Sequence, residues 1–180
     1  MGKLLPSIDE HTLQFIKTQK MFFVATAATT GKVNLSPKGS DSFRVLSPNQ
    51  VAWLNLTGSG NETAAHLLEN NRMTIMMCAF EGKPNIMRLY GTAKAIYEQD
   101  PEWTTYSPLF EDNTGARQIF LMEVNQVQHS CGMAVPLYDY IEQRDLLDKT
   151  HDKLGREKVK EYWKAKNMVS LDGLPTGQKI

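Results

Sequence analysis

The order of hydrophobic and polar positions predicts a chain built mainly from β-strands. Short apolar or alternating runs recur between turn signals, and helical patterns between them are few, which favours an antiparallel sheet or barrel. The expected strands span 22–27, 33–36, 43–46, 51–56, 73–80, 85–97 and 116–124, the last continuing irregularly to 131. Pro37 follows the second run, and we expect it to interrupt the strand because proline has no backbone N–H to donate.

Helical patterns flank these strands. Ser7-Ile-Asp-Glu10 has the S-x-x-E form of a capping box and predicts a helix to about Lys20. A short helix is expected over 64–70, and another from Asp100 with proline in its first turn. Residues 139–167 are charged and helical in pattern, with a stripe that indicates a helix packed on the barrel, a binding surface being the alternative. The stripe consists of Leu147, Leu154, Val159, Tyr162 and Trp163.

The loop between the strand at 51–56 and the helix at 64–70 carries the most informative chemistry. It reads Thr57-Gly-Ser-Gly-Asn-Glu-Thr63, so hydroxyl groups and glycines lead directly into a helix start. The first N–H groups of a helix have no intrahelical partner and carry partial positive charge, which suits a phosphate. Ser59 with Glu62 also fits a capping box, and Asn61 is a good N-cap by itself, so capping and phosphate binding both remain open.

A phosphate in this loop needs positive charge from elsewhere in the fold. The loop contains no cation, and no Gly-Lys-Ser/Thr follows it, so it is not a Walker motif. The candidate cations are Lys38, Arg44, Arg72 and Arg88.

Composition narrows the functional classes. The chain has 180 residues, of which 41% are hydrophobic and 22% charged, and this predicts a single globular domain over 1–180. A formal net charge of zero gives no support for nucleic acid or an anionic membrane as partner, and no apolar run approaches membrane-spanning length. Two cysteines, Cys78 and Cys131, are expected to be free thiols in a reducing, cytoplasmic setting. The four histidines are scattered, so no metal site is expected.

Four segments together resemble one known family. They are VNLSPKG (33–39), LNLTGSGNETAAHLLENN (54–71), RMTIMMCAFEG (72–82) and MRLYGTA (87–93). In this order they resemble the pyridoxamine 5'-phosphate oxidase-like FMN-binding split barrels, over about residues 20–131. The resemblance implies a six-stranded antiparallel barrel, and the helical pattern of the last third adds a C-terminal helical extension over about 137–180. The resemblance also implies a homodimer with FMN between the subunits, and a phosphate held around the 57–63 loop.

Carried over residue by residue, the resemblance implies a set of cofactor contacts. Lys38 matches a basic position near flavin and substrate, and Arg88 a polar contact on the strand after the turn. The other matching positions are Ser36 and Pro37 facing the isoalloxazine, Asn55 and Leu56 at a strand end, and Thr57, Ser59, Asn61, Glu62 and Thr63 around the phosphate.

The chain also departs from authentic pyridoxamine phosphate oxidases. It has Glu62-Thr63-Ala64 where they carry an Arg-Lys pair, and Asn85-Ile86 where they carry Arg-Gln. Its end, SLDGLPTGQKI, contains neither the Trp nor the Arg that grips their substrate. We therefore expect a branch of the family with a different substrate.

The resulting expectation is an FMN-dependent oxidoreductase acting on a small molecule, with the redox chemistry supplied by the flavin. Lys38 and Arg44 are candidates for stabilising reduced flavin, although Arg44 could equally form a salt bridge at a strand edge. No catalytic base is assigned. The alternatives are a non-enzymatic module that binds flavin or haem, with His66, His129 or a methionine as axial ligand, and a deazaflavin-dependent reductase.

Overall fold

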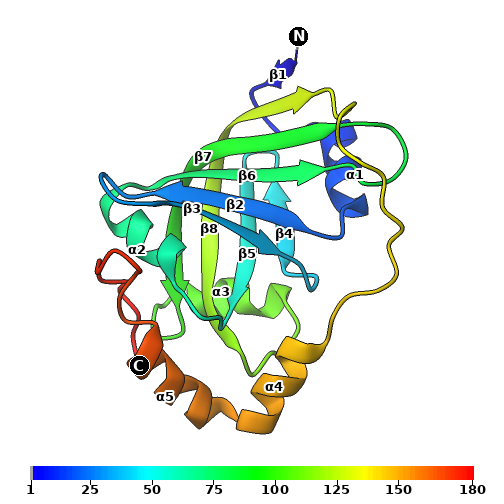
Figure 1. Ribbon diagram of the computed structural model, residues 1–180. Helices are drawn as coiled ribbons and strands as arrows, with labels where there is room; N and C mark the ends of the chain where they lie inside the picture. The colour runs from blue at the N-terminus through cyan, green and yellow to red at the C-terminus, as the bar shows by residue number, and fades with distance from the viewer. Residues whose placement is uncertain (1) are drawn as a thin grey trace.

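The computed structural model describes residues 2–180, and its elements follow the predicted order (Figure 1). The strands are β1 (Lys3–Leu5), β2 (Phe22–Ala27), β3 (Val33–Lys38), β4 (Phe43–Ser47), β5 (Gln50–Leu56), β6 (Arg72–Cys78), β7 (Ile86–Tyr97) and β8 (Ala116–Ser130). The helices are α1 (Glu10–Thr18), α2 (Glu62–Glu69), α3 (Trp103–Tyr106), the 3-10 helix η1 (Ser107–Leu109), α4 (Leu146–Leu154) and α5 (Arg156–Lys166).

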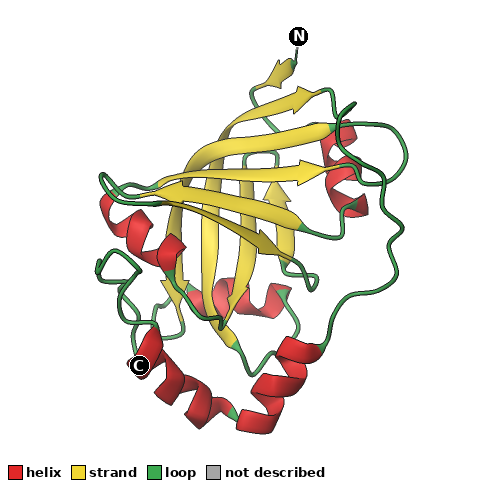
Figure 2. Ribbon diagram, in the orientation of Figure 1, coloured by secondary structure: helices red, strands yellow, loops and turns green. Residues whose placement is uncertain are grey.

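The strands form one antiparallel sheet that curls around a common interior, with helices at its ends and edges (Figure 2). The strand order is β3-β2-β6-β7-β8-β5-β4, with β1 paired to β8. The predicted fold class, a mainly β antiparallel barrel with flanking helices, is confirmed. Over residues 2–180 the sheet has 8 strands rather than six. The short β1 is one of the additional strands, and its few residues offered no pattern to recognise.

The expected break at Pro37 is wrong. Strand β3 continues to Lys38, with Pro37 opposite Phe23 and Lys38 opposite Phe22 in β2. The ladder tolerates the proline because β3 lies at the edge of the sheet, where the missing N–H would face away from β2. The consequence is that Lys38 lies on a regular strand and points to the same side as Phe22, which is buried.

The long strands β7 and β8 form the back of the barrel and pair over most of their length. The pairing shifts between Tyr90 and Gly91, where a β-bulge lets the two backbones approach closely. A Cβ at Gly91 would lie 1.8 Å from the carbonyl oxygen of Glu123, so only glycine fits. The interior on one side of these strands is filled by apolar side chains that include Val24, Trp53, Ile75, Leu89 and Phe120.

The helices differ from the predictions mainly at their ends. Helix α1 begins at Glu10 with Asp9 as N-cap, whose carboxylate accepts from the Thr12 N–H at 2.8 Å, so the Ser7 capping box does not form. The predicted helical region 139–167 is two helices separated by Gly155, preceded by an extended strap over 132–145. Of the predicted stripe, only Val159 and Trp163 are buried, whereas Leu147, Leu154 and Tyr162 are exposed. His151 is buried as well.

The strap carries the chain along one side of the barrel, from the end of β8 to the helices at the opposite end (Figure 1). Two residues of the strap contact the barrel side. Tyr138 packs its ring against that of Phe80 and donates its N–H to the Phe80 carbonyl oxygen, and Gln143 donates to the Lys20 carbonyl oxygen at 2.8 Å. After α5 the chain returns toward α2, so residues far apart in sequence meet there. Across residues 2–180, none of the helices has the length and apolar character needed to span a membrane.

Candidate functional site

The 57–63 loop leads from the end of β5 to the first turn of α2, as predicted. Gly58, Ser59 and Gly60 are exposed, whereas Thr57 and Asn61 are buried. The loop therefore has an outer side that faces solvent and an inner side that packs against the protein.

The backbone N–H groups of this loop are largely uncommitted. Thr57 N–H donates to the Gly115 carbonyl oxygen at 2.8 Å, and Ala65 N–H donates to the Asn61 carbonyl oxygen at 3.3 Å. Between them, the N–H groups of residues 58–64 have no acceptor among residues 2–180. A run of free amides at a helix start concentrates partial positive charge, which favours an anion.

The side chains expected to cap α2 are used elsewhere. Asn61 occupies the N-cap position but makes no capping hydrogen bond within the described part of the chain. Its carboxamide instead accepts from Gln118 Nε2 at 2.9 Å and donates to the Asn167 carbonyl oxygen at 3.4 Å. The Glu62 carboxylate accepts from the Leu171 N–H at 3.0 Å and 3.1 Å. Neither residue blocks the helix amides.

Lys38 lies in the barrel near a cluster of side-chain amides. Its Nζ is 3.4 Å from Asn55 Oδ1 and 5.1 Å from the centre of the Trp53 ring. Burial lowers the pKa of Lys38 to about 8, and the positive charge of Arg117 adds to this effect. A lysine with this pKa loses its charge near physiological pH more readily than an exposed one.

Arg117, at the start of β8, is a buried cation beside the loop. Its Nη2 donates to the Gly60 carbonyl oxygen at 3.0 Å, and its Nε donates to Gln118 Oε1 at 3.0 Å. Its Nη1 is buried and has no hydrogen-bond partner among residues 2–180. Burial lowers the pKa of Arg117 to about 10, which leaves the guanidinium charged at neutral pH. The charged groups of the site thus include two cations, Lys38 and Arg117, and the Glu62 carboxylate in the first turn of α2.

A chain of amide side chains links Lys38 to the loop. Asn55 Nδ2 donates to Gln118 Oε1 at 2.7 Å, and Gln118 Nε2 donates to Asn61 Oδ1 at 2.9 Å and to Gln178 Oε1 at 3.0 Å. These neutral groups fix the surroundings of both cations without neutralising either charge.

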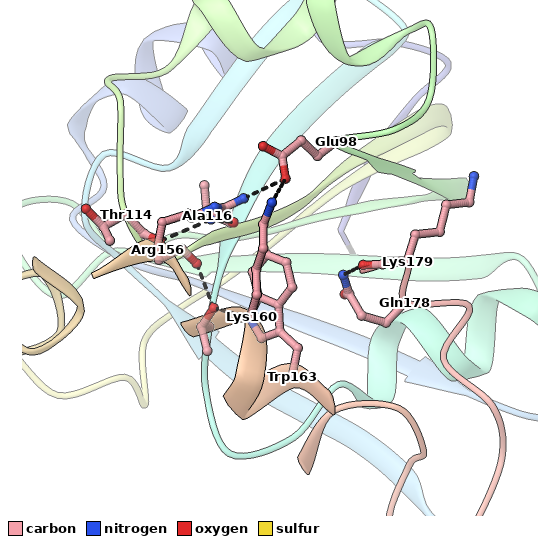
Figure 3. Close-up of polar contacts among 10 residues, drawn as sticks. Glu98, Thr114, Ala116, Arg156, Lys160, Trp163, Gln178 and Lys179 are labelled. Carbon is pink, nitrogen blue, oxygen red and sulfur yellow. Dashed lines mark hydrogen bonds and ion pairs between the residues drawn. The ribbon is translucent and has the colours of Figure 1, made fainter. Parts of the chain in front are cut away.

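Residues 163–178, called here the C-terminal segment, pack on the inner side of the loop. Trp163 Nε1 donates to Thr57 Oγ1 at 2.7 Å, and Asn167 Nδ2 donates to the Gly58 carbonyl oxygen at 3.1 Å. Preceding this segment, Arg156 and Lys160 converge on Glu98, each at 3.1 Å (Figure 3). Arg156 also donates to the Thr114 and Ala116 carbonyl oxygens, which ties α5 to the start of β8.

The other predicted site residues are distributed over the barrel. Thr63 Oγ1 accepts from Asn34 Nδ2 at 3.2 Å, so Thr63 lies beside β3. Ser36 is half-buried opposite Val24, Pro37 is exposed on the outer face, and Leu56 is half-buried in a second apolar cluster.

The predicted cations other than Lys38 have their own partners. Arg44 forms a two-pronged contact with the Asp41 carboxylate, at 3.0 Å and 2.9 Å, which matches the salt-bridge alternative. Arg72 Nε donates to Asn70 Oδ1 at 3.1 Å, and Arg88 Nη1 donates to Ser130 Oγ at 3.1 Å.

Sequence reasoning missed Arg117, Gln118, Trp163 and Asn167. One available signal was Arg117-Gln118, a polar pair directly before the apolar run Ile119-Phe-Leu-Met122. Two polar residues at the start of a buried strand indicate a polar interior at that end. Trp163 and Asn167 gave no such signal, because their contacts depend on the path of the strap.

Comparisons with known proteins agree with the fold and place the chain in a family. The family described as pyridoxamine 5'-phosphate oxidase matches residues 8–131. The pyridoxamine 5'-phosphate oxidase family protein ustO of Aspergillus flavus is 37% identical over 187 residues, covering 94% of this chain and 75% of that protein.

Among solved structures, two illustrate the likeness in fold. A tagged variant of HupZ from group A Streptococcus aligns with a TM-score of 0.55 at 18% identity, covering 68% of this chain and 99% of that one. The FAD-binding protein from Mycobacterium smegmatis aligns with a TM-score of 0.50 at 11% identity, covering 70% of this chain and 97% of that one.

Proposed function

This chain belongs to the pyridoxamine 5'-phosphate oxidase family, and we propose that it binds FMN and acts as an oxidoreductase on a small molecule. The flavin would supply the electron-transfer chemistry, while the protein holds its phosphate and sets the charge around its ring. The departures from authentic pyridoxamine phosphate oxidases, such as Glu62-Thr63 in place of an Arg-Lys pair, support a different substrate.

The observation that carries this proposal is the run of free amides over residues 58–64. Within residues 2–180 these N–H groups have no acceptor; the loop is exposed at Gly58, Ser59 and Gly60, whereas Asn61, Thr63 and Ala64 are buried. A phosphate has enough oxygen acceptors to bond several amides at once, and the dipole of α2 favours its charge. The loop therefore suits the terminal phosphate of FMN.

Arg117 and Lys38 supply the positive charge that the loop lacks. Arg117 contacts the Gly60 carbonyl oxygen, and its Nη1 is buried without a partner in the described chain. A buried charge without a partner is costly, so an anion that approaches it gains a large share of its binding energy from that pairing. Lys38, with its pKa of about 8, is placed to present a charge or a proton beside Asn55.

The outer face of the sheet supports a homodimer. Val33 and Leu35 on the edge strand β3 are 74% and 62% exposed, and their cross-strand neighbours are Ala27 and Ala25. A hollow of about 510 Å³ lies beside them and is lined in part by Tyr90. Adjacent exposed apolar side chains over a shallow hollow suit a protein partner. We assign this face to a second copy of the chain, with the flavin between subunits.

The first experiment is the visible absorption spectrum of the purified protein before and after FMN is added and free ligand removed. Flavin bands retained in proportion to the protein would support the proposal. A haem spectrum, or a colourless protein that releases all added FMN, would contradict it. Retention of a deazaflavin but not of FMN would contradict FMN as the cofactor and leave the proposed redox role in place.

Arg117→Met gives a sharper test, because it removes the unpaired charge. We expect FMN affinity to fall by about 10- to 100-fold, the loss typical of a charged hydrogen bond. The melting temperature without FMN should rise, because an uncompensated buried charge is gone. The control is Arg144→Met, which removes an exposed guanidinium on the strap and should leave FMN affinity unchanged. An unchanged FMN affinity in Arg117→Met would exclude Arg117 from the site.

A further inference from the structure

The acceptor groups of the 57–63 loop are held from its inner side. The Gly58 carbonyl oxygen accepts from Asn167 Nδ2 at 3.1 Å, and the Gly60 carbonyl oxygen accepts from Arg117 Nη2 at 3.0 Å. Thr57 Oγ1 accepts from Trp163 Nε1 at 2.7 Å and itself donates to the Gly115 carbonyl oxygen at 2.8 Å. The loop's acceptors are thus satisfied by the protein, whereas its donors over 58–64 are not.

Peptide geometry links these two facts. In a planar trans peptide the C=O of one residue and the N–H of the next point in opposite directions. Fixing the Gly58 carbonyl toward Asn167 therefore turns the Ser59 N–H away from the C-terminal segment. Fixing the Gly60 carbonyl toward Arg117 turns the Asn61 N–H away in the same manner. The hydrogen bonds to the Gly58 and Gly60 carbonyl groups therefore set the directions of the Ser59 and Asn61 N–H groups.

The C-terminal segment is itself firmly anchored, so it can act as a fixed support. Asn167 and Thr176 are fully buried, and Thr176 Oγ1 donates to the Asn167 carbonyl oxygen at 2.7 Å. Tyr97, on β7, donates its hydroxyl to the Thr176 carbonyl oxygen at 2.5 Å, and Lys32 pairs with Asp172 at 2.5 Å. These bonds connect the segment to β7 and to the turn between β2 and β3.

We propose that Asn167 is a positioning residue for the bound phosphate, acting through the Gly58 carbonyl group. The inference rests on the proposed function, because it concerns the same phosphate. Asn167 does not contact the phosphate. It orients the peptide group whose N–H does, with Trp163 fixing the adjoining end of the loop. The C-terminal segment, outside the matched residues 8–131, thereby becomes part of the cofactor site.

The test compares FMN with riboflavin, which has the same ring and ribityl chain but no phosphate. Asn167→Ala removes the donor to Gly58 while leaving the residue's own backbone carbonyl in place. We expect the dissociation constant for FMN to rise about fivefold, the loss of one neutral hydrogen bond, with that for riboflavin unchanged. The control is Asn49→Ala, in the turn that precedes β5, which removes a carboxamide that donates to the Pro6 and Val124 carbonyl oxygens and which should leave the ratio of the two constants unchanged.

The outcomes separate this inference from the function on which it rests. If the unmodified protein binds neither flavin, the proposed function fails and the inference fails with it. If it binds FMN more tightly than riboflavin and Asn167→Ala leaves their ratio unchanged, only the inference fails.

A second measurement on the unmodified protein covers the case in which Asn167→Ala does not fold. Amide resonances of Ser59 and Asn61 should shift when FMN is titrated and stay in place with riboflavin. FMN binding without those two shifts would overturn the proposal.

Discussion

Arg117 is a charge that the protein buries without an opposing carboxylate in the described residues. Its hydrogen bonds are to Gln118 and the Gly60 carbonyl oxygen, both uncharged acceptors. Proteins seldom retain such a group unless an anion completes its surroundings for part of the time. Removing this charge should therefore stabilise the ligand-free protein and weaken its binding of an anion.

Lys38 gives a prediction for the dependence of stability on pH. Its pKa is lowered from 10.5 to about 8 in the folded protein, so between these values the unfolded chain binds more protons. The free energy of unfolding should therefore rise with pH from about 8 to 10.5, by up to about 3 kcal/mol. Urea unfolding of the protein and of Lys38→Met across this range should show that the variant lacks this rise.

The control for this measurement is Lys83→Met, which removes an exposed lysine in the turn between β6 and β7. It should retain the pH dependence of the unmodified protein. Parallel profiles for the unmodified protein and Lys38→Met would show that Lys38 titrates at its ordinary pKa.

Single residues were the hardest features to place from sequence. Lys38 could be singled out because the loop needs a cation from elsewhere in the chain and because Lys38 matches a basic position of the family that the chain resembles. Arg117 could not be connected to Gly60, because 57 positions separate them and only the curl of the sheet brings them together. Asn61 was expected to serve either as a cap or as a phosphate contact. Its side chain instead joins Gln118 and Asn167, an arrangement set by tertiary structure.

At the scale of elements, strands were predictable and helix ends were not. The short, largely apolar runs at 22–27 and 51–56 became β2 and β5 with little change, because such runs are typical of strands that are mostly buried. The region 139–167 was only partly predicted, since a charged sequence with scattered leucines does not reveal where a strap ends and a helix begins. Gly155, with φ 79°, separates α4 from α5.

The bulge between β7 and β8 gives a prediction about stability. Gly91→Ala would place a Cβ 1.8 Å from the Glu123 carbonyl oxygen, so the backbones must separate. We expect a loss of about 2 kcal/mol in the free energy of unfolding, measured by urea denaturation. The control is Gly58→Ala, because a Cβ there meets no atom within 4 Å in the described structure. Equal stability of the two variants would contradict the close approach at the bulge.

At the scale of the whole molecule, the proposed homodimer can be tested on the β3 edge. Leu35→Glu places a charge on the exposed apolar face, where burial against a second copy would be costly. Light scattering should give a dimer mass for the unmodified protein and a monomer mass for the variant. Leu137→Glu is the matched control, since Leu137 is 73% exposed on the strap, and it should stay dimeric. A monomeric unmodified protein in the presence of FMN would exclude this assembly.

The packing of the C-terminal segment on the 57–63 loop has a consequence for biosynthesis. Chains are made from the N-terminus, so every strand of the barrel leaves the ribosome before residues 163–178 do. During that interval the Gly58 carbonyl oxygen and Thr57 Oγ1 lack the donors that Asn167 and Trp163 later provide. A nascent barrel can therefore fold while its loop is still unsupported. Ribosome-bound chains stalled before and after this segment emerges would differ in the protection of that loop from proteases.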